Sequence, residues 1–395
     1  MSMDHPCETR TAIRSDDAAI CISLELSRSS WLITSLLPGG GKMSRHGVPA
    51  GDVAGLLARF ASLRDRAQKR TGERPRLIVI QEAGLDGFWL HRVLEAEGIE
   101  SHVVDAASIA VPRRRRRVKT DRIDGELLLR TLLAWRRGEP RVCSMVRTPT
   151  VAEEDRRRLC REHKTLVAER VRHVNRIKGL LFGQGMRGYE PLRRDRRQRL
   201  AELRTGDGRA LPAHLAAQIG RELDRLELLL EQIKAVHAER QAMLAAAGEA
   251  ADATAVPALL LELRGIGPAF AATVWAEGLC RPFANRRQIG AYAGLAPTPW
   301  RSGALVHEQG ISKAGNPRLR TTMIQLAWLW LRHQPDSALT RWFHAQARSG
   351  RPGWRKTAIV ALARKLLVAL WKYVHHGVVI EGAVTSSAAK TAAKA

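Results

Sequence analysis

Four carboxylates stand in chemically suggestive contexts in the first third of the chain, and two of them form a close pair. Asp121 and Asp124 lie three residues apart in KTDRIDGELLLR (residues 119–130), where a segment with helical spacing begins. Residues three apart share one face of a helix, so this pair can hold a metal ion together. The same two acids also suit helix capping, because a carboxylate in the first turn accepts backbone N–H groups and favours the helix dipole. The pair alone leaves both interpretations open.

The other two acids belong to apolar, strand-like stretches. Glu25 lies in CISLELS, and Glu82 closely follows the apolar run at residues 77–80. Sites of α/β proteins are built at the carboxyl ends of parallel strands. Hard cations prefer oxygen ligands, and two such ions can clamp a scissile phosphate. The four acids together predict a site for Mg²⁺ or Mn²⁺, although each acid by itself is also compatible with an ordinary surface position.

A basic, loop-like segment at residues 295–317 offers a different chemistry. PWRSG places Ser302 next to Arg301, and ISKAG places Ser312 next to Lys313. A serine among cations can bond a phosphate oxygen, or it can attack phosphorus as an activated nucleophile. From the residues alone the phosphate contact is the favoured interpretation. Two further cations at the end of this segment are Arg318 and Arg320.

Two more segments predict contacts with a nucleic-acid backbone. LRGIGPAFAA (residues 263–272) resembles a helix-hairpin-helix, in which Gly265 and Gly267 let a turn present N–H groups to a phosphate. A simple glycine turn between two helices is the alternative. The other segment is a run of arginines just before the acidic pair, made of Arg113, Arg114, Arg115, Arg116 and Arg117.

The composition predicts a polyanionic partner. The 395 residues include 65 Lys and Arg against 39 Asp and Glu, which gives a formal net charge of +26. Such an excess is typical of nucleic-acid binding. A membrane surface is the rival, but there is no run of about 18 apolar residues and no signal-peptide core. Five scattered cysteines without a Cys/His cluster indicate a reduced cytoplasmic protein.

The elements that must position these residues follow from the hydrophobic periodicity. Strands alternate with helices over residues 18–140, which predicts an α/β domain. Two strands joined near SRSS are expected first, followed by a glycine-rich turn. Residues 150–246 have long helical patterns, with an apolar stripe typical of an antiparallel helical hairpin or coiled coil. Residues 255–378 are again mostly helical, around the loop-like segment. Residues 1–17 and the tail at 379–395 are expected to be disordered.

Seven motifs in this order resemble the DEDD-type insertion-sequence transposases, a family of serine recombinases guided by a bridge RNA. They are SLELS, QEAGLDGFW, KTDRID, RGIGPAFA, YAGLAP, RSG and SKAGNPRLR. The resemblance as a whole extends over about residues 18–378. The resemblance implies an RNase H-like (RuvC-like) α/β N-terminal domain. A central antiparallel coiled-coil region and a mostly α-helical C-terminal transposase domain with the helix-hairpin-helix-like element would follow.

The resemblance also implies roles for particular residues. The acidic quartet would be Glu25, Glu82, Asp121 and Asp124, and Ser302 would be the nucleophile, with Ser312 and Lys313 in the neighbouring basic motif. One position departs from the family, in which the first acid is aspartate. Glutamate is about one methylene longer, and Mg²⁺ demands near-ideal octahedral geometry, so we expect a reshaped metal site.

The implied activity is Mg²⁺-dependent DNA recombination through a phosphoserine. The implied partners are DNA at the insertion-sequence ends and target, a structured guide RNA, and further copies of the chain in a dimer or tetramer, with no membrane. The protein would act in the bacterial cytoplasm, associated with the nucleoid. Two alternatives remain: a metal-dependent junction-resolving nuclease that uses water, and an inactive nucleic-acid-binding remnant, which the Glu25 substitution keeps open.

Overall fold

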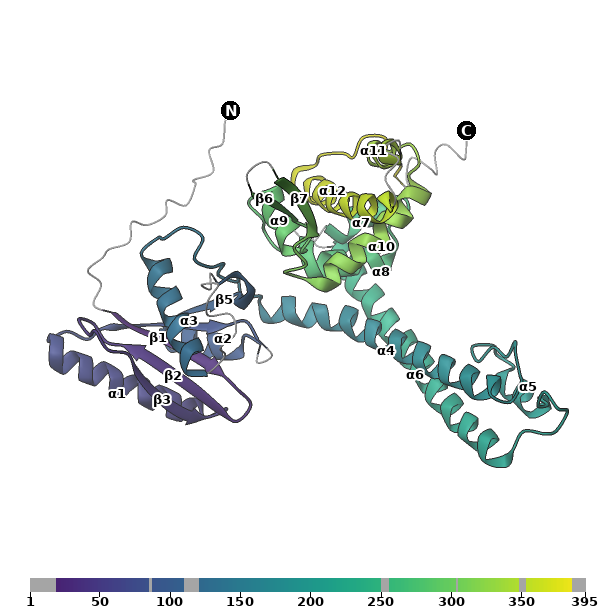
Figure 1. The fold of residues 1–395 in the computed structure, drawn as a ribbon, viewed down its shortest axis with the longest axis horizontal. Coiled ribbons are helices and arrows are strands. Elements are labelled where there is room, and N and C mark those ends of the chain that lie inside the picture. Colours follow the sequence, from purple (N-terminus) through teal and green to yellow (C-terminus); the bar gives the residue numbers. More distant parts are fainter. Residues whose placement is uncertain are drawn as a thin grey trace. The chain divides into compact units, whose positions relative to one another are not determined.

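The chain forms two compact units, Met1–Pro149 and Thr150–Ala395, in a computed structural model. The structure describes residues 19–84, 87–109, 121–249, 256–302, 305–347 and 353–385. The predicted disordered N-terminus at 1–17 lies outside these residues. Figure 1 shows the elements of each unit.

The first unit is built on a five-stranded mixed sheet with the order β3-β2-β1-β4-β5. The central strand β1 pairs parallel with β4, and β4 pairs parallel with β5, whereas β1 with β2 and β2 with β3 pair antiparallel. This mixed α/β sheet is consistent with the fold that the resemblance implies. The strands are β1 Ala19–Leu26, β2 Ser30–Leu36, β3 Ser44–Pro49, β4 Arg76–Glu82 and β5 Glu100–Val104.

Strand β3 was not predicted. Its sequence SRHGVP contains Gly and Pro and no apolar alternation, so it has the composition of a turn. The strand forms because it is at the edge of the sheet, where it pairs with β2 on one side only. Edge strands tolerate polar residues and proline because the backbone N–H and C=O groups on their outer side have no strand to pair with.

Helices cover both faces of this sheet. α1 (Val53–Thr71) and α2 (Trp89–Ala96) pack on one face, against Ile20, Ile22 and Val79. α3 (Asp121–Arg136) packs on the other face, where its Leu128, Leu129 and Leu132 contact the alternate residues of β1 and β4. A short 3₁₀ turn at Ala106–Ser108 follows β5.

The second unit begins with a long helical hairpin. α4 (Val151–Phe182) starts with a capping box in which Thr150 and Glu153 bond each other's backbone N–H groups. α6 (Ala213–Glu249) returns along it, and the short α5 (Arg196–Glu202) lies between them in sequence. The predicted stripe on α6 does pack on α4: Leu223 and Leu226 share one buried cluster with Ile177, and Val236 shares another with Leu166. The two helices are antiparallel, since the end of α4 meets the start of α6.

The rest of the second unit packs around one large core. Its elements are α7 Val256–Glu262, α8 Pro268–Val274, the π-helix Trp275–Leu279, α9 Arg286–Tyr292, β6 Pro297–Ser302, β7 Leu305–Ile311, α10 Pro317–His333, α11 Ala338–Ala347 and α12 Trp354–His376. Among the described residues, no helix has both the length and the apolar character needed to cross a membrane.

Two predictions about this part were wrong. The loop-like segment contains the β-hairpin β6–β7, because its prolines and glycines exclude helix but not paired strands. The disordered tail was predicted to start at 379, yet Ile380 is buried and the backbone of Val384 bonds the side chain of Gln334. These contacts join segments far apart in sequence, so local composition does not reveal them. Residues 386–395 lie outside the description.

Candidate active site

The two strand acids lie at the same edge of the sheet. β1 and β4 are parallel, and their last registered pair is Leu24 with Gln81. Glu25 and Glu82 are the next residues of the two strands, at their carboxyl ends. The two glutamates therefore lie at the same edge of the parallel pair of strands.

Both acids also belong to the face that α3 covers. Side chains alternate along a strand, and Cys21 of β1 and Ile80 of β4 pack with α3. Glu25 and Glu82 have the same parity as these residues in their strands. The glutamates therefore fall on the side of the sheet from which the acidic pair of α3 comes.

The first turn of α3 is held directly against β1 and β2. The Ser23 hydroxyl donates a 2.7 Å hydrogen bond to the carbonyl oxygen of Gly125. A Cβ added at Gly125 would lie 2.6 Å from the Thr34 hydroxyl oxygen and 3.7 Å from the carboxyl carbon of Glu25. The absence of a side chain at Gly125 thus lets α3 approach β1 and β2. The Glu25 carboxyl lies next to the turn of α3 that carries Asp124.

The remaining two acids of the predicted quartet are Asp121 and Glu82. Asp121 opens α3, one turn before the half-buried Asp124, and the position of its side chain lies outside the description. Glu82 is exposed at the end of β4. Among the described residues, no group of three His, Cys, Asp or Glu side chains is close enough to hold a metal ion. The structure thus places Glu25 beside the helix turn that carries Asp124, and the full quartet stays a prediction.

The chemistry of the four acids nevertheless fits a divalent metal. Carboxylate oxygens are the ligands that Mg²⁺ and Mn²⁺ prefer. Glu25 and Glu82 lie at one edge of the sheet, and the N-terminal part of α3 beside Glu25 also favours negative charge.

The two candidate serines lie at opposite ends of the β-hairpin. Ser302 is the last residue of β6 and pairs with Leu305, whereas the backbone N–H of Ser312 bonds the carbonyl of Ala296 at the base. At about 3.3 Å per residue, the two serines are roughly 15–20 Å apart. The side chains of Ser302 and its neighbour Arg301 lie outside the description. The serines therefore occupy distinct sites.

The base of the hairpin is a tightly built basic loop. Lys313 has a positive φ of 56° and is exposed. A guanidinium N–H of Arg320 donates to the Lys313 carbonyl oxygen at 2.9 Å. Arg318 is exposed in the first turn of α10. Arg320 therefore braces this loop, whereas Lys313 and Arg318 present their charges to the surface.

A buried acid supports the same loop, and the sequence analysis missed it. Glu277 is fully buried in the π-helix and accepts bonds from Arg161 of α4 at 2.9 and 3.2 Å. It also accepts a 2.8 Å bond from the amide of Asn316, which caps α10. Burial raises the pKa of Glu277, but the bonds from Arg161 and Asn316 outweigh it and keep the pKa below its ordinary value. The only signal in the sequence is a lone acid within an apolar run, ATVWAEGL.

The glycine turn predicted to bind phosphate joins α7 to α8. Gly265 has a φ of 93°, and a Cβ there would lie 2.7 Å from the Cβ of His333 in α10. Gln334, the next residue, donates to the carbonyl oxygen of Arg264 at 2.8 Å. Close packing against α10 thus explains Gly265. Gly267 is the N-cap of α8 and has open space around it.

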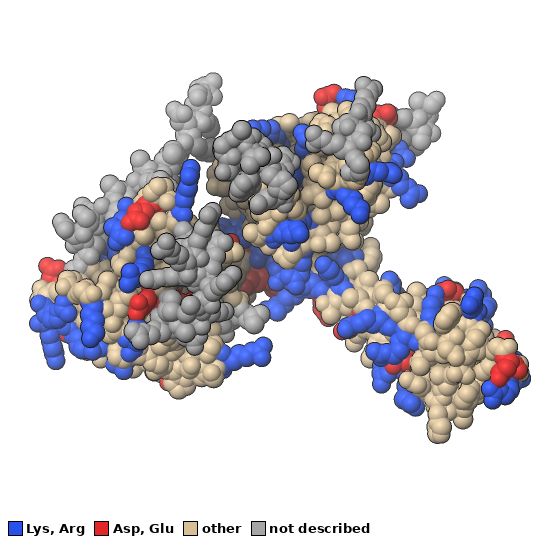
Figure 2. Space-filling model, viewed as in Figure 1, with Lys and Arg blue, Asp and Glu red and all other residues tan. Residues whose placement is uncertain are grey.

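The run Arg113–Arg117 lies outside the described residues. Elsewhere, Lys and Arg are distributed over the visible face of both units (Figure 2). Many arginines of the helical hairpin are paired with acids of the hairpin itself. Arg197, for example, contacts both Asp224 and Glu227. Arginine density on this hairpin therefore overstates its free positive charge.

Two family models match the chain. One is described as "Transposase IS116/IS110/IS902 family" and matches residues 258–342, which include both candidate serines. The other is described as "Transposase" and matches residues 51–184, which include Glu82, Asp121 and Asp124. Glu25 lies before this second match.

Individual relatives show the same similarity. The chain is 70% identical over 385 residues to "Putative transposase y4rJ" of Sinorhizobium fredii, covering 95% of this chain and 97% of that protein. It is 30% identical over 231 residues to the transposase for insertion sequence element IS1111A of Coxiella burnetii, covering 57% and 60%. With an uncharacterized 43.6 kDa protein of insertion element IS110 of Streptomyces coelicolor it shares 27% identity over 154 residues, covering 39% and 37%.

Proposed function

The chain belongs to the IS116/IS110/IS902 family of transposases, and from this premise we propose that it cuts and rejoins DNA at insertion-sequence ends through a phosphoserine. The observation that carries the proposal is the placement of Glu25 against the turn of α3 that holds Asp124. This placement brings the Glu25 carboxyl beside Gly125, the residue that follows Asp124, although Glu25 and Asp124 are 99 residues apart in sequence.

The acidic quartet would hold one or two divalent cations through carboxylate oxygens. A bound cation would supply positive charge to the scissile phosphate. Ser23, Thr34 and Gly125 position the site, since they set how closely α3 approaches β1. Glu25 is longer than the aspartate of the family, and the missing Cβ at Gly125 leaves room beside its carboxyl group.

Ser302 would be the nucleophile. Its Oγ forms a bond to phosphorus while the bond from phosphorus to the 3′ oxygen breaks. The 3′ oxygen leaves as a free hydroxyl, and the strand remains attached as a 5′-phosphoserine. A 3′-hydroxyl of the partner strand then attacks this phosphoserine and releases the serine. Arg301 adds positive charge to the same segment of sequence, and positive charge favours a phosphate.

The site would be completed between subunits. The acids belong to Met1–Pro149 and Ser302 belongs to Thr150–Ala395, so they are parts of separate compact units. A dimer or tetramer would let the acids of one copy serve the serine of another, with the α4–α6 hairpin mediating assembly. A structured guide RNA is the further partner that we propose, supported by the charge of +26. RNA that copurifies with the protein, once sequenced, would identify this guide.

A covalent-adduct assay tests the proposal. The protein, donor DNA, guide RNA and Mg²⁺ should give an SDS-resistant DNA adduct. Ser302→Ala should lose both adduct and recombination, because the nucleophilic oxygen is gone. Ser312→Ala is the matched control: the hairpin separates this serine from the reacting end, so the adduct should persist and DNA binding should weaken.

Two results would contradict the assignment. An adduct that survives in Ser302→Ala and disappears in Ser312→Ala would make Ser312 the nucleophile. DNA cleavage without any adduct in the wild-type protein would support the alternative, a metal-dependent junction-resolving nuclease that uses water. A wild-type protein that binds DNA without cleaving it would support the inactive remnant.

A further inference from the structure

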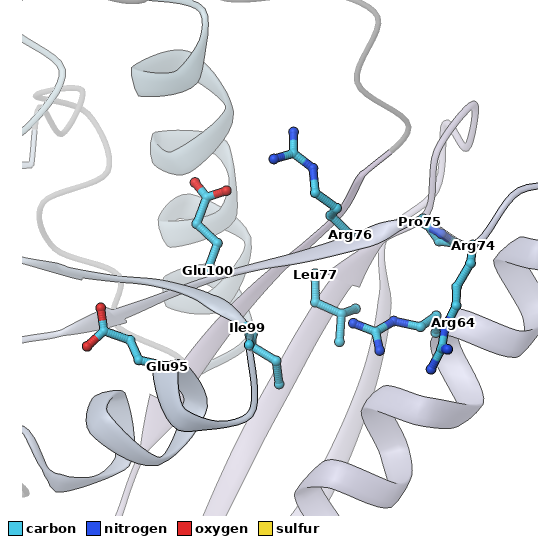
Figure 3. A pocket seen from close by; sticks show the side chains of 9 residues that line it. Arg64, Arg74, Pro75, Arg76, Leu77, Glu95, Ile99 and Glu100 are labelled. Carbon is cyan, nitrogen blue, oxygen red and sulfur yellow. The ribbon is translucent and has the colours of Figure 1, made fainter.

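The first unit has a cavity at the edge of the sheet opposite the acids. Its volume is about 580 Å³, and it lies where β4 and β5 begin, between α1 and α2 (Figure 3). The residues that line it include Arg64, Arg74, Leu77, Glu95 and Ile99. Volumes of this size are typical of small-ligand sites. No residue proposed for catalysis belongs to this cavity.

One end of the cavity is cationic. Arg64 comes from α1 and Arg74 from the segment just before β4, and both guanidinium groups lie at the same end in Figure 3. The Nε of Arg64 is buried and has no hydrogen-bond partner. A buried donor without a partner costs free energy, and an anion would satisfy it. Arginine binds phosphate oxygens with two parallel hydrogen bonds, so a phosphate suits this end.

The middle and the far end have different chemistry. Leu77 and Ile99 are almost fully buried and form an apolar floor between the charged ends. Glu95 of α2 lies at the far end, and its carboxylate is 3.2 Å from Nε2 of His91. The ring of His91 is held in turn by the Ser101 hydroxyl at 2.9 Å. The carboxylate is therefore oriented, while its side chain remains 57% exposed to accept further donors.

We propose that this cavity binds one unpaired nucleotide of a nucleic-acid strand. Its phosphate would bond Arg64 and Arg74, its base would lie on Leu77 and Ile99, and Glu95 would accept a bond from an exocyclic amino group. The inference rests on the proposed function only in that the strand belongs to the nucleic acid on which the protein acts. Duplex DNA cannot fill the site, because its bases are stacked and paired, whereas unpaired bases are free to enter a pocket.

The amino group predicts a base preference. Cytosine carries an amino donor at C4, where thymine and uracil carry an acceptor oxygen that a carboxylate repels. The intact protein should therefore bind unpaired oligo-dC more tightly than oligo-dT, by about threefold or more. The same preference is expected for oligo-C over oligo-U if the strand is RNA.

Fluorescence anisotropy with short labelled strands tests the site on the full-length protein. The double variant Arg64→Ala/Arg74→Ala should bind oligo-dC more weakly, with a salt slope smaller by about 0.7 per lost phosphate contact. Glu95→Gln should keep most of the affinity and lose the preference for dC over dT. Lys69→Ala is the control, because this exposed lysine of α1 has the same charge and does not line the cavity. Arg74→Ala alone gives a second measurement at an exposed position, independent of any loss of packing at Arg64.

The cleavage assay separates this inference from the proposed function. The cavity variants should still cleave DNA at saturating concentration, whereas quartet variants should lose cleavage and keep the dC preference. Equal affinity and equal slope in the wild type and the double variant would overturn the inference. So would a dC preference that survives in Glu95→Gln, or a blunt duplex that loses as much affinity as oligo-dC in the double variant.

Discussion

Among single residues, Asp124 has the sharpest expected effect. It is half-buried in the first turn of α3, beside the glycine that approaches Glu25. Asp124→Asn keeps the shape but replaces a charged metal ligand by a weak neutral one, so we expect strand cleavage to be lost. Folding should change little, because the substitution creates no cavity. Cleavage in Mg²⁺ and thermal unfolding of the same preparation measure the two quantities.

Asp65→Ala is the control for that experiment. Asp65 is an exposed acid on α1, on the opposite face of the sheet from α3, and it should retain full cleavage. Full cleavage by Asp124→Asn in Mg²⁺ would remove the acidic pair from the mechanism and return it to the capping interpretation.

At the scale of elements, two glycines lock α9 to the basic loop before α10. Gly294 has a φ of 65°, and a Cβ there would overlap the carbonyl oxygen of Ala314, while a Cβ at Gly315 would overlap that of Tyr292. Gly294→Ala should lower the free energy of unfolding by roughly 2–4 kcal/mol, because strain and overlap add. Calorimetric unfolding measures this loss.

Gly220→Ala should raise the free energy of unfolding, whereas Gly294→Ala should lower it. Gly220 is inside α6 and has no atom near its missing Cβ. Alanine in a helix interior stabilises the helix by roughly 0.5–1 kcal/mol relative to glycine, so the free energy of unfolding should rise by about this amount. A similar destabilisation by both alanines would show that the loop contact has no special role.

The helical hairpin has a buried acid that should make its stability depend on pH. Glu222 of α6 is 2.5 Å from Nδ1 of His173 and 3.0 Å from a guanidinium nitrogen of Arg176, both on α4. Burial raises the pKa of Glu222, but the bonds from His173 and Arg176 outweigh it and hold the pKa below its ordinary value of 4.5. A lowered carboxyl pKa stabilises the folded state above pH 4.5, and this stabilisation is lost as the pH falls through the folded-state value.

Glu222→Gln should therefore cost about 2 kcal/mol at pH 7, the usual contribution of hydrogen bonds to a charged group. The difference from the wild type should shrink toward zero as the pH falls through the lowered pKa of Glu222 in the folded state, because the wild-type carboxyl then becomes neutral too. Denaturant unfolding at several pH values measures this difference. Glu231→Gln, on the exposed side of α6, should show no such trend. A constant difference at all pH values would mean that the charge of Glu222 is irrelevant.

At the scale of the whole molecule, the net charge of +26 should make nucleic-acid binding strongly salt-dependent. If about eight phosphates are neutralised, log K should fall with log salt with a slope of about −6 to −7. Titrations from low to high KCl measure this slope. A slope near zero would show that the positive charge serves something other than a nucleic-acid backbone.

Internal pairing limits which cations can contribute to that slope. Arg176 and Arg225 both contact Glu222, and Arg197 contacts two acids, so these arginines are already neutralised within the hairpin. Exposed cations such as Lys313 and Arg318 should contribute more to binding a phosphate. The net charge calculated from the sequence includes paired and unpaired cations equally, and only the contacts in the structure distinguish them.

Local patterns were sufficient for the type and order of most elements. The spacing of apolar residues predicted α1, α3, α4 and α6, and it placed Glu82 at the end of a buried parallel strand, because periodicity depends only on neighbouring residues. The order of short motifs likewise indicated the family.

What the patterns missed depends on partners far away in the chain. Ser23 bonds Gly125 across 102 residues, and Arg161 bonds Glu277 across 116. β3 and β6–β7 became strands because a neighbouring strand supplied their hydrogen bonds. Such contacts arise when distant segments pack against one another, and no short stretch of sequence contains both partners.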